Sequence, residues 1–268
     1  MSETALYRFD LIEDYPCFTQ KNLLLLDALI RYNSDYSVTE DVSHPDYLES
    51  YAGILKRDRE NFFNFESDKN LYKVVRSIDK INSTHLQSEG SSKKVKPHQG
   101  IIKTVDKIKS IRGLRDRLYT GDPAVVHEIA SAVETKYNFS FATKFCTFVC
   151  SCVWGDESKY CIYDEVVQSI LPLYIHRYVG AKEAEKYYKI VNIGRSTQRV
   201  ESTVCLLKDR NRENGYSEYR KIISNIINGI EQKDGICVSY SQFDQLLWYY
   251  FKGSKKRIQE ALNTLLPK

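Results

Sequence analysis

The sequence lacks any apolar run long enough to cross a membrane. The four leucines at 23–26 form a short apolar run that Asp27 interrupts, whereas a transmembrane helix needs about 20 apolar residues. The start of the chain also lacks a basic segment followed by an apolar one, so we expect no secretory signal peptide. These absences favour a cytoplasmic protein with no membrane partner.

The sequence also lacks a disulfide framework and a recognisable metal motif. Its seven cysteines are odd in number and the chain is long, so we expect reduced thiols. Cys146, Cys150, Cys152 and Cys161 follow a C-x₃-C-x-C-x₈-C spacing, which is not a known zinc or iron–sulfur pattern, and the five histidines are scattered. We therefore predict no metal and no cofactor, and we expect these cysteines to pack as small apolar side chains.

No strong excess of one charge is present, because the net charge is only +4, but the charges are unevenly distributed. Residues 1–70 carry a net charge of −7, residues 71–120 a net +8, residues 121–180 a net −3 and residues 181–268 a net +6. The two basic stretches permit a nucleic-acid partner. The alternative interpretation is that they are solvated faces of helices.

Glycine and proline are scarce, at 12 and 6 residues, and apolar residues recur at helical spacing along most of the chain. The pattern predicts an all-α fold. The predicted helices cover residues 23–32, 45–63, 68–83, 100–118, 123–137, 142–152, 165–178, 181–191, 197–209, 216–231, 241–251 and 254–265. Residues 85–99 are rich in Ser, Gly, Lys and Pro and are predicted to form a loop.

The most informative segment covers residues 138–167. It predicts two helices that meet at a tight polar hairpin, with Thr143 and Lys144 near the start of the second helix. Asp164 follows Lys144 after twenty residues and is predicted to cap a third helix. A helix, a loop and a helix N-terminus can fold back over this span, so we expect Lys144 and Asp164 to face one cleft.

This segment resembles the helix-hairpin-helix DNA glycosylases, in particular their 8-oxoguanine branch in its reduced bacterial form. Thr143 and Lys144 match the Thr-Lys pair of that branch, and Asp164 matches its aspartate. Ser140 and Ala142 stand where the family has hairpin glycines. The close match covers roughly 40 residues.

The resemblance implies one all-α domain with two lobes and a cleft between them. Residues 1–118 would form most of the N-terminal lobe, residues 119–180 the hairpin and catalytic segment, and residues 181–268 the C-terminal helices. It also implies DNA N-glycosylase and AP-lyase activity in base excision repair. The neutral amine of Lys144 would displace a modified base, such as an oxidised purine, and form a Schiff base, while Asp164 would stabilise the cationic sugar.

The same resemblance places contacts to the substrate. The hairpin residues Ser140, Ala142 and Thr143 would bind the DNA backbone, and the lysines of the predicted loop, Lys93, Lys94 and Lys96, would add phosphate contacts. A pocket for the flipped base would contain Gln245, Trp248, Tyr249 and Phe148, of which Gln245 and Tyr249 have the spacing of the branch's base-contacting pair.

Two other classes of function stay open. The chain could be a catalytically inactive module that binds nucleic acid or a protein partner, because the hairpin lacks its glycines. It could also be an accessory subunit of a multigene bacterial defence or modification system. The sequence does not predict the oligomeric state.

Overall fold

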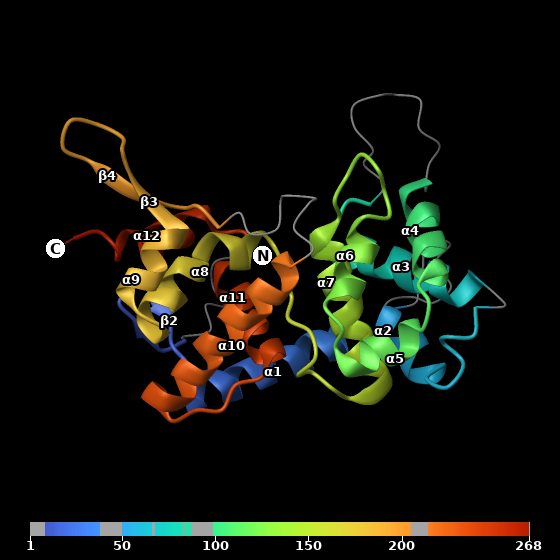
Figure 1. Ribbon diagram of the computed structural model, residues 1–268. Coiled ribbons are helices and arrows are strands. Elements are labelled where there is room, and N and C mark those ends of the chain that lie inside the picture. The colour runs from blue at the N-terminus through green and yellow to red at the C-terminus, as the bar shows by residue number, and fades with distance from the viewer. Residues whose placement is uncertain are drawn as a thin grey trace. The chain divides into compact units, whose positions relative to one another are not determined.

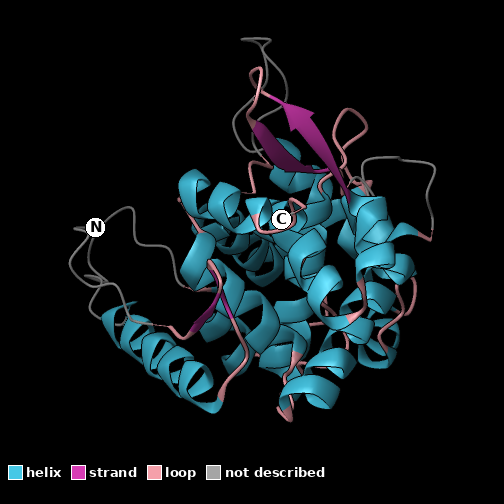
Figure 2. Cartoon of the chain, turned by 90° about the vertical axis from the view of Figure 1, so that its left-hand side faces the viewer, coloured by secondary structure: helices cyan, strands magenta, loops and turns pink. Residues whose placement is uncertain are grey.

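The computed structural model describes residues 9–37, 50–65, 68–82, 84–86, 99–204 and 214–267. These residues are mostly helical, as predicted, and form α1 to α12 with two small antiparallel sheets (Figures 1 and 2). None of their helices has the length and apolar character needed to cross a membrane. Contacts divide the chain into two compact units. Unit 1 contains residues 1–40, 164–205 and 221–268, and unit 2 contains residues 41–163 and 206–220.

Unit 2 is a helical assembly around α7. Its helices are α2 (Tyr51–Arg57), α3 (Asp68–Asn82), α4 (Gln99–Ser110), α5 (Leu114–Thr120), α6 (Ala124–Ala130) and α7 (Phe139–Val149), followed by a π-helical turn (Cys150–Trp154) and the start of α10 (Gly215–Asp234). α7 packs against α6 and α3, and α2 packs against α3 and the π-helical turn. The core therefore lies along α7.

Unit 1 has α8 at its centre. It contains β1 (Leu11–Ile12), β2 (Tyr15–Pro16), α1 (Gln20–Ser37), α8 (Glu165–Tyr178), α9 (Ala181–Ala184), a short 3-10 turn (Glu185–Tyr187), β3 (Tyr188–Asn192), β4 (Gln198–Ser202), the rest of α10, α11 (Tyr240–Phe251) and α12 (Lys255–Asn263). α8 contacts α9, α11, α12 and β4. Figure 1 shows β3 and β4 as a hairpin that extends away from the helices of this unit.

α10 passes close to the C-terminal end of α8 at Gly229. A Cβ atom at Gly229 would lie 2.4 Å from the carbonyl oxygen of Tyr178, a distance at which one of the two backbones must move. The Tyr178 hydroxyl in turn donates a hydrogen bond of 2.6 Å to Asp234 at the end of α10. Glycine at this position thus permits the approach of the two helices.

The basic helix predicted over residues 100–118 is two helices. α4 ends at Ser110 and α5 begins at Leu114, because Gly113 between them has φ = +65°. Glycine adopts this left-handed conformation at little steric cost, so Gly113 permits the turn. The apolar residues keep helical spacing across it, which is why the sequence predicted one helix.

The helix predicted over residues 181–191 is confirmed only in its first part, because α9 and the 3-10 turn cover residues 181–187. The helix predicted over residues 197–209 is wrong over residues 198–202, which form β4. Residues 188–202 form the β3–β4 hairpin, in which Ile190 pairs with Val200 and Val191 with Arg199. Ile190, Val191 and Val200 have β-branched side chains, which favour strands, and Gly194 lies in the connecting turn. The turn closes with a 2.9 Å hydrogen bond from Ile193 N to Thr197 O.

Other boundaries also differ from prediction. α2 covers Tyr51–Arg57 and so ends before residue 63, the predicted end of this helix, while residues 45–49 lie outside the described residues. α6 ends at Ala130, well before residue 137. In contrast, α8, α10, α11 and α12 occupy the predicted segments within a few residues. Most of the loop predicted over residues 85–99 lies outside the described residues.

Candidate active site

The candidate site begins with Lys144, which lies on α7 in unit 2. α7 is apolar on almost every side, and all its residues except Ser140 and Phe148 are buried. The Lys144 side chain shares this burial, with an exposed fraction of 6%. Lysine is among the residues that are least often buried in this way, so Lys144 is an unusual feature of the helix.

Thr143 connects α7 to the segment that precedes Asp164. Its hydroxyl oxygen accepts a 3.2 Å hydrogen bond from the backbone N–H of Tyr163, and its hydroxyl lies 3.1 Å from Ser140 O. Thr143 and Tyr163 are the chain neighbours of Lys144 and Asp164 respectively. A hydrogen bond therefore links the residue before Lys144 to the residue before Asp164.

The segment Tyr160 to Tyr163, which we call the connector, is buried and fixed by hydroxyl groups of α10. The Tyr216 hydroxyl accepts a 2.8 Å hydrogen bond from Cys161 N and lies 3.2 Å from Cys161 O. The Tyr219 hydroxyl donates to Ile162 O. Side chains thus satisfy polar backbone groups that no regular secondary structure pairs, as buried backbone requires. These hydrogen bonds join the connector to α10.

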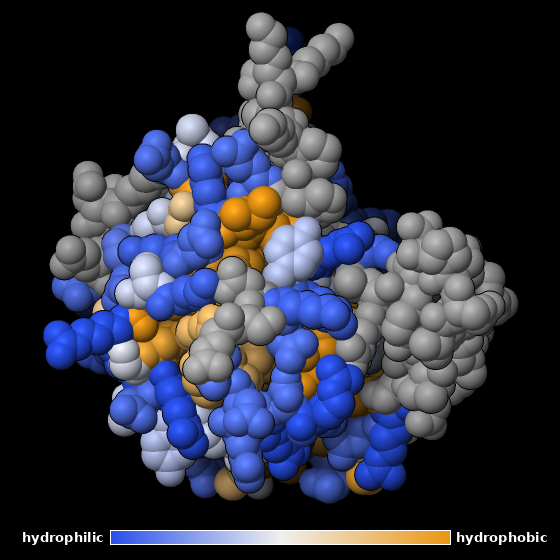
Figure 3. Space-filling model, turned by 90° about the vertical axis from the view of Figure 1, so that its right-hand side faces the viewer, coloured by the Kyte–Doolittle hydropathy of each residue, from blue (hydrophilic) through white to orange (hydrophobic). Residues whose placement is uncertain are grey.

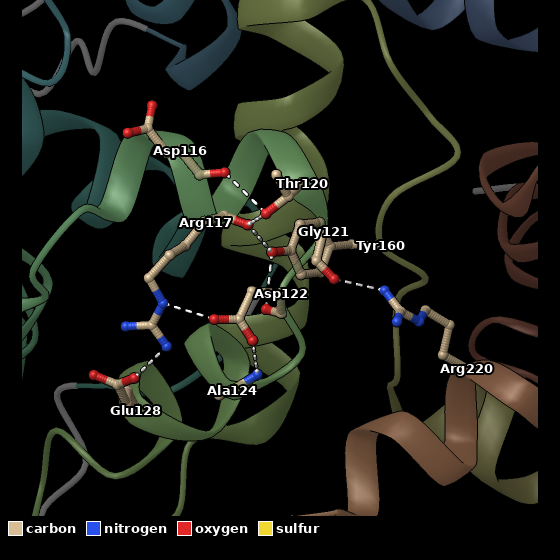
Figure 4. Close-up of polar contacts among 9 residues, drawn as sticks. All are labelled: Asp116, Arg117, Thr120, Gly121, Asp122, Ala124, Glu128, Tyr160 and Arg220. Atoms are coloured by element: carbon tan, nitrogen blue, oxygen red, sulfur yellow. Dashed lines mark hydrogen bonds and ion pairs between the residues drawn. The ribbon is translucent and has the colours of Figure 1, made fainter.

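A second set of contacts holds the loop before α6 against the connector (Figure 4). Arg117 forms ion pairs with Asp122 at 2.7 Å and with Glu128 at 2.6 Å. The Tyr160 hydroxyl donates a 3.0 Å hydrogen bond to Asp122 O. Arg220 donates to Gly121 O at 2.6 Å. Burial opposes ionisation of Asp122, but hydrogen bonds from Arg117 and Ala124 outweigh it and lower the pKa of this carboxyl.

Asp164 is the N-cap of α8, as predicted from its position before the helix. Its Oδ1 accepts a 3.1 Å hydrogen bond from Val167 N, and the side chain is 7% exposed. A carboxylate at a helix N-terminus is also stabilised by the helix dipole. Asp164 is the first residue of unit 1, and Lys144 belongs to unit 2.

The predicted hairpin residues lie within a helix. α7 begins at Phe139 rather than near residue 142, so Ser140, Ala142 and Thr143 are in its first turns. Ala142 and Thr143 are fully buried, and Ala142 N donates a 3.0 Å hydrogen bond to Asn138 O. The Ala142 amide is thus already used within the helix. Without glycines, this segment continues as regular helix instead of opening into a turn.

The predicted base-pocket residues lie on two helices. Gln245 and Tyr249 are half-buried on α11 in unit 1, and Trp248 beside them is 41% exposed. The Trp248 and Tyr249 rings meet edge to face with centroids 5.2 Å apart. Phe148 is on α7 in unit 2, where its ring stacks on that of Tyr51 at 4.5 Å.

The remaining predicted residues give less information. Lys93, Lys94 and Lys96 lie outside the described residues. Cys146 and Cys150 are buried, and burial raises the pKa of the Cys150 thiol to about 12 and that of Cys146 well above its ordinary value. Both therefore carry protonated thiols at neutral pH. No cluster of three or more His, Cys, Asp or Glu side chains suited to a metal ion occurs in the part of the chain that the structure describes.

Sequence reasoning missed the residues of α10 that hold the connector. Tyr216 and Tyr219 are three residues apart and so lie on one helix face, next to Arg220. In a chain with 20 tyrosines this spacing is common. One signal could have identified them: a buried connector outside regular secondary structure needs side chains that form hydrogen bonds with its backbone.

Comparisons with known proteins add one finding. The model of the HI_0787_N family, described as an N-terminal domain, matches residues 37–151. This match falls almost wholly inside unit 2 and includes Lys144. No curated protein and no solved structure matches the chain.

Proposed function

We propose that the protein is a DNA glycosylase with AP-lyase activity, in which Lys144 is the nucleophile and Asp164 stabilises the reacting sugar. One observation carries the proposal. The Thr143 hydroxyl binds the backbone of Tyr163, so the positions adjacent to a buried lysine and to a buried carboxylate are joined. Asp164 follows Tyr163 directly in the chain, as Lys144 follows Thr143.

The chemistry follows from the two groups. The neutral amine of Lys144 attacks C1′ of the sugar, a C–N bond forms, and the bond to the base breaks with its electron pair and a proton passing to the base. Loss of a proton from nitrogen and opening of the sugar ring give the Schiff base. Removal of a C2′ proton then expels the 3′ phosphate. The Asp164 carboxylate stabilises positive charge on the sugar during base departure.

The contacts to the flipped base are assigned to exposed or half-buried side chains of α11. Gln245, Tyr249 and the exposed Trp248 would contact the flipped base, with stacking worth roughly 1–3 kcal/mol. The substrate class is a modified base, with an oxidised purine as the first candidate. The backbone of Ala142 is not given a role, because its N–H already bonds within α7.

Borohydride trapping on DNA that contains an abasic site tests the proposal. The Schiff base is reduced to a stable amine, so the wild type should form a covalent complex with the DNA. Lys144→Met removes the amine but keeps an apolar stem of similar length, so the variant should fold and form no complex. Equal trapping by wild type and Lys144→Met would refute the role of Lys144.

Lys136 supplies the matched control. Burial lowers the pKa of its amine, which makes it a rival nucleophile in unit 2, and its ammonium group donates to His85 O at 2.6 Å. Lys136→Met should leave trapping unchanged. If Lys136→Met lost trapping and Lys144→Met retained it, Lys136 and not Lys144 would be the nucleophile.

The second candidate is a binding module that does no chemistry. The observation that favours it is the full burial of Ala142 and Thr143 in a helix, where the related hairpin would bind phosphate. A protein of this kind would bind DNA in a shift assay but would form no borohydride-dependent complex at any pH.

A further inference from the structure

Unit 2 contains an open hollow that none of the predicted site residues lines. It lies between the segment after α2 and the turn that joins α4 to α5, and its volume is about 450 Å³. That size is within the ~300–1,000 Å³ range of small-molecule sites in proteins. The floor includes Ile111 and Leu114, which are buried, so the hollow rests on the core of the unit. The hollow can therefore hold a ligand of the size of a nucleotide.

Two aromatic rings line the hollow. Phe63 and Phe65 are half-buried, and Phe63 stacks on Trp154 with centroids 5.6 Å apart and planes 13° apart. Phe62 packs edge-on against Phe63 at 5.2 Å and against Phe65 at 6.4 Å. These contacts hold both rings before any ligand arrives. Because the planes of Phe63 and Phe65 are 68° apart, a planar base can stack on one of these rings and meet the other edge to face.

Two cations also line the hollow. Lys109 comes from the end of α4 and Arg115 from the start of α5. The left-handed turn at Gly113 brings the two segments together on the same hollow. Arg115 is exposed and has no ion-pair or hydrogen-bond partner among the described residues. A guanidinium group with free donors can bind a phosphate through two parallel hydrogen bonds.

A carboxylate, that of Glu60, lines the same hollow and likewise has no partner among the described residues. A carboxylate repels a phosphate but accepts a hydrogen bond from the amino group of a base, as acidic side chains do with cytosine. The hollow thus combines aromatic rings, cations and a carboxylate, which suit the base, the phosphate and the amino group of a nucleotide respectively. A purely acidic ligand would use the cations and leave the rings and Glu60 without a function.

We propose that this hollow binds a nucleotide, with its base against Phe63 and Phe65 and its phosphate at Lys109 and Arg115. The base carries an exocyclic amino group that donates to Glu60. The nucleotide is either free or one unit of a single strand, since both present the same base and phosphate. The site does not depend on the reaction at Lys144.

Titration calorimetry with CMP, UMP and a 12-nucleotide oligodeoxycytidine tests the site. CMP should bind the wild type, and Arg115→Ala should weaken binding by about tenfold or more because the phosphate loses a bidentate partner. Arg112→Ala is the matched control, because Arg112 is equally exposed and cationic but does not line the hollow. It should change affinity less than twofold.

The remaining measurements distinguish a free nucleotide from a single strand and give the results that would overturn the proposal. Equal affinity for CMP and the oligonucleotide indicates a free nucleotide, whereas tighter, salt-dependent binding of the oligonucleotide indicates a single strand. In either case UMP should bind more weakly than CMP in the wild type, and Glu60→Gln should reduce this preference. Absence of binding by both CMP and the oligonucleotide at millimolar concentration would overturn the proposal. Equal weakening by Arg112→Ala and Arg115→Ala, or equally tight binding of a polyglutamate peptide, would also overturn it, because only diffuse charge would then be involved.

Discussion

Two helices carry most of the predicted site residues, and they differ in how they hold them. α7 buries Lys144, and Thr143 beside it bonds to the buried connector. α11 is an amphipathic helix whose N-terminus is closed by a capping box at Ser239, and it leaves Trp248 41% exposed. Burial is unusual for a lysine such as Lys144, whereas an exposed side chain on an amphipathic helix such as α11 is ordinary.

The difference shows which features point to function. A lysine that is only 6% exposed is unusual in a helix of apolar residues, so it is the feature of α7 that points to function. Exposed aromatic residues on α11 cost the fold little and are explained by the surplus of apolar surface in most proteins. In our proposal the chemistry therefore lies at Lys144 and Asp164, and α11 has the supporting role of binding.

Asp164→Asn gives the largest expected effect among the changes that test this difference. Asparagine is also a good N-cap, so the free energy of unfolding should change by less than ~1 kcal/mol. Base excision should nevertheless fall by about two orders of magnitude or more, because the neutral amide cannot stabilise a cationic sugar. Thermal unfolding and single-turnover excision of 8-oxoguanine from duplex DNA measure the two quantities.

Asp164→Ala distinguishes the two roles of the carboxylate. It removes both cap and charge, so it should lose ~1 kcal/mol or more of stability in addition to activity. Full activity in Asp164→Asn would mean that Asp164 is only the N-cap of α8. The proposal that it stabilises the reacting sugar would then be wrong.

Tyr216→Phe should have the next largest effect. It leaves the buried N–H and C=O of Cys161 without the hydroxyl that bonds them, at a cost of ~1–3 kcal/mol in the free energy of unfolding. Tyr119→Phe is the control, because Tyr119 is 59% exposed. Urea denaturation measures both. A similar, small change in the two variants would show that the hydroxyl groups of α10 do not fix the connector.

Trp248→Ala should have the smallest effect on stability, within ~0.5 kcal/mol, because the side chain is exposed and lies on the surface of α11. Affinity for DNA with an extruded modified base should still fall by a factor that corresponds to ~1–3 kcal/mol of lost stacking. Unfolding and fluorescence anisotropy on the same preparation compare the two. A large loss of stability with no loss of affinity would make Trp248 a packing residue instead.

Much of the fold could be predicted from the sequence where periodicity and caps agree. α8 occupies the predicted residues because Asp164 caps a segment with helical spacing. The β3–β4 hairpin could not be identified in the same way, because short strands paired only with each other give a weak period-two signal. The break at Gly113 was hidden because apolar residues continue at helical spacing on both sides of it.

The candidate site also contains residues that the sequence identified and residues that it did not. Lys144 and Asp164 could be singled out because their spacing along the chain is visible, and Thr143 lies beside Lys144. The residues that hold the connector come from a helix more than fifty positions later, as the pairing of Tyr216 with Cys161 shows. Such contacts depend on the tertiary fold, which a single sequence does not display. The hollow beside Phe63 and Arg115 was missed for the same reason.

The location of the trapped adduct tests the central claim most directly. The wild-type protein is reduced with borohydride on DNA that contains an abasic site, digested with a nuclease and a protease, and analysed by tandem mass spectrometry. Our account predicts that the sugar remnant is attached to Nζ of Lys144, on the peptide that contains Thr143. Attachment to Lys136, to another lysine or to the N-terminal amine, with Lys144 unmodified, would contradict it.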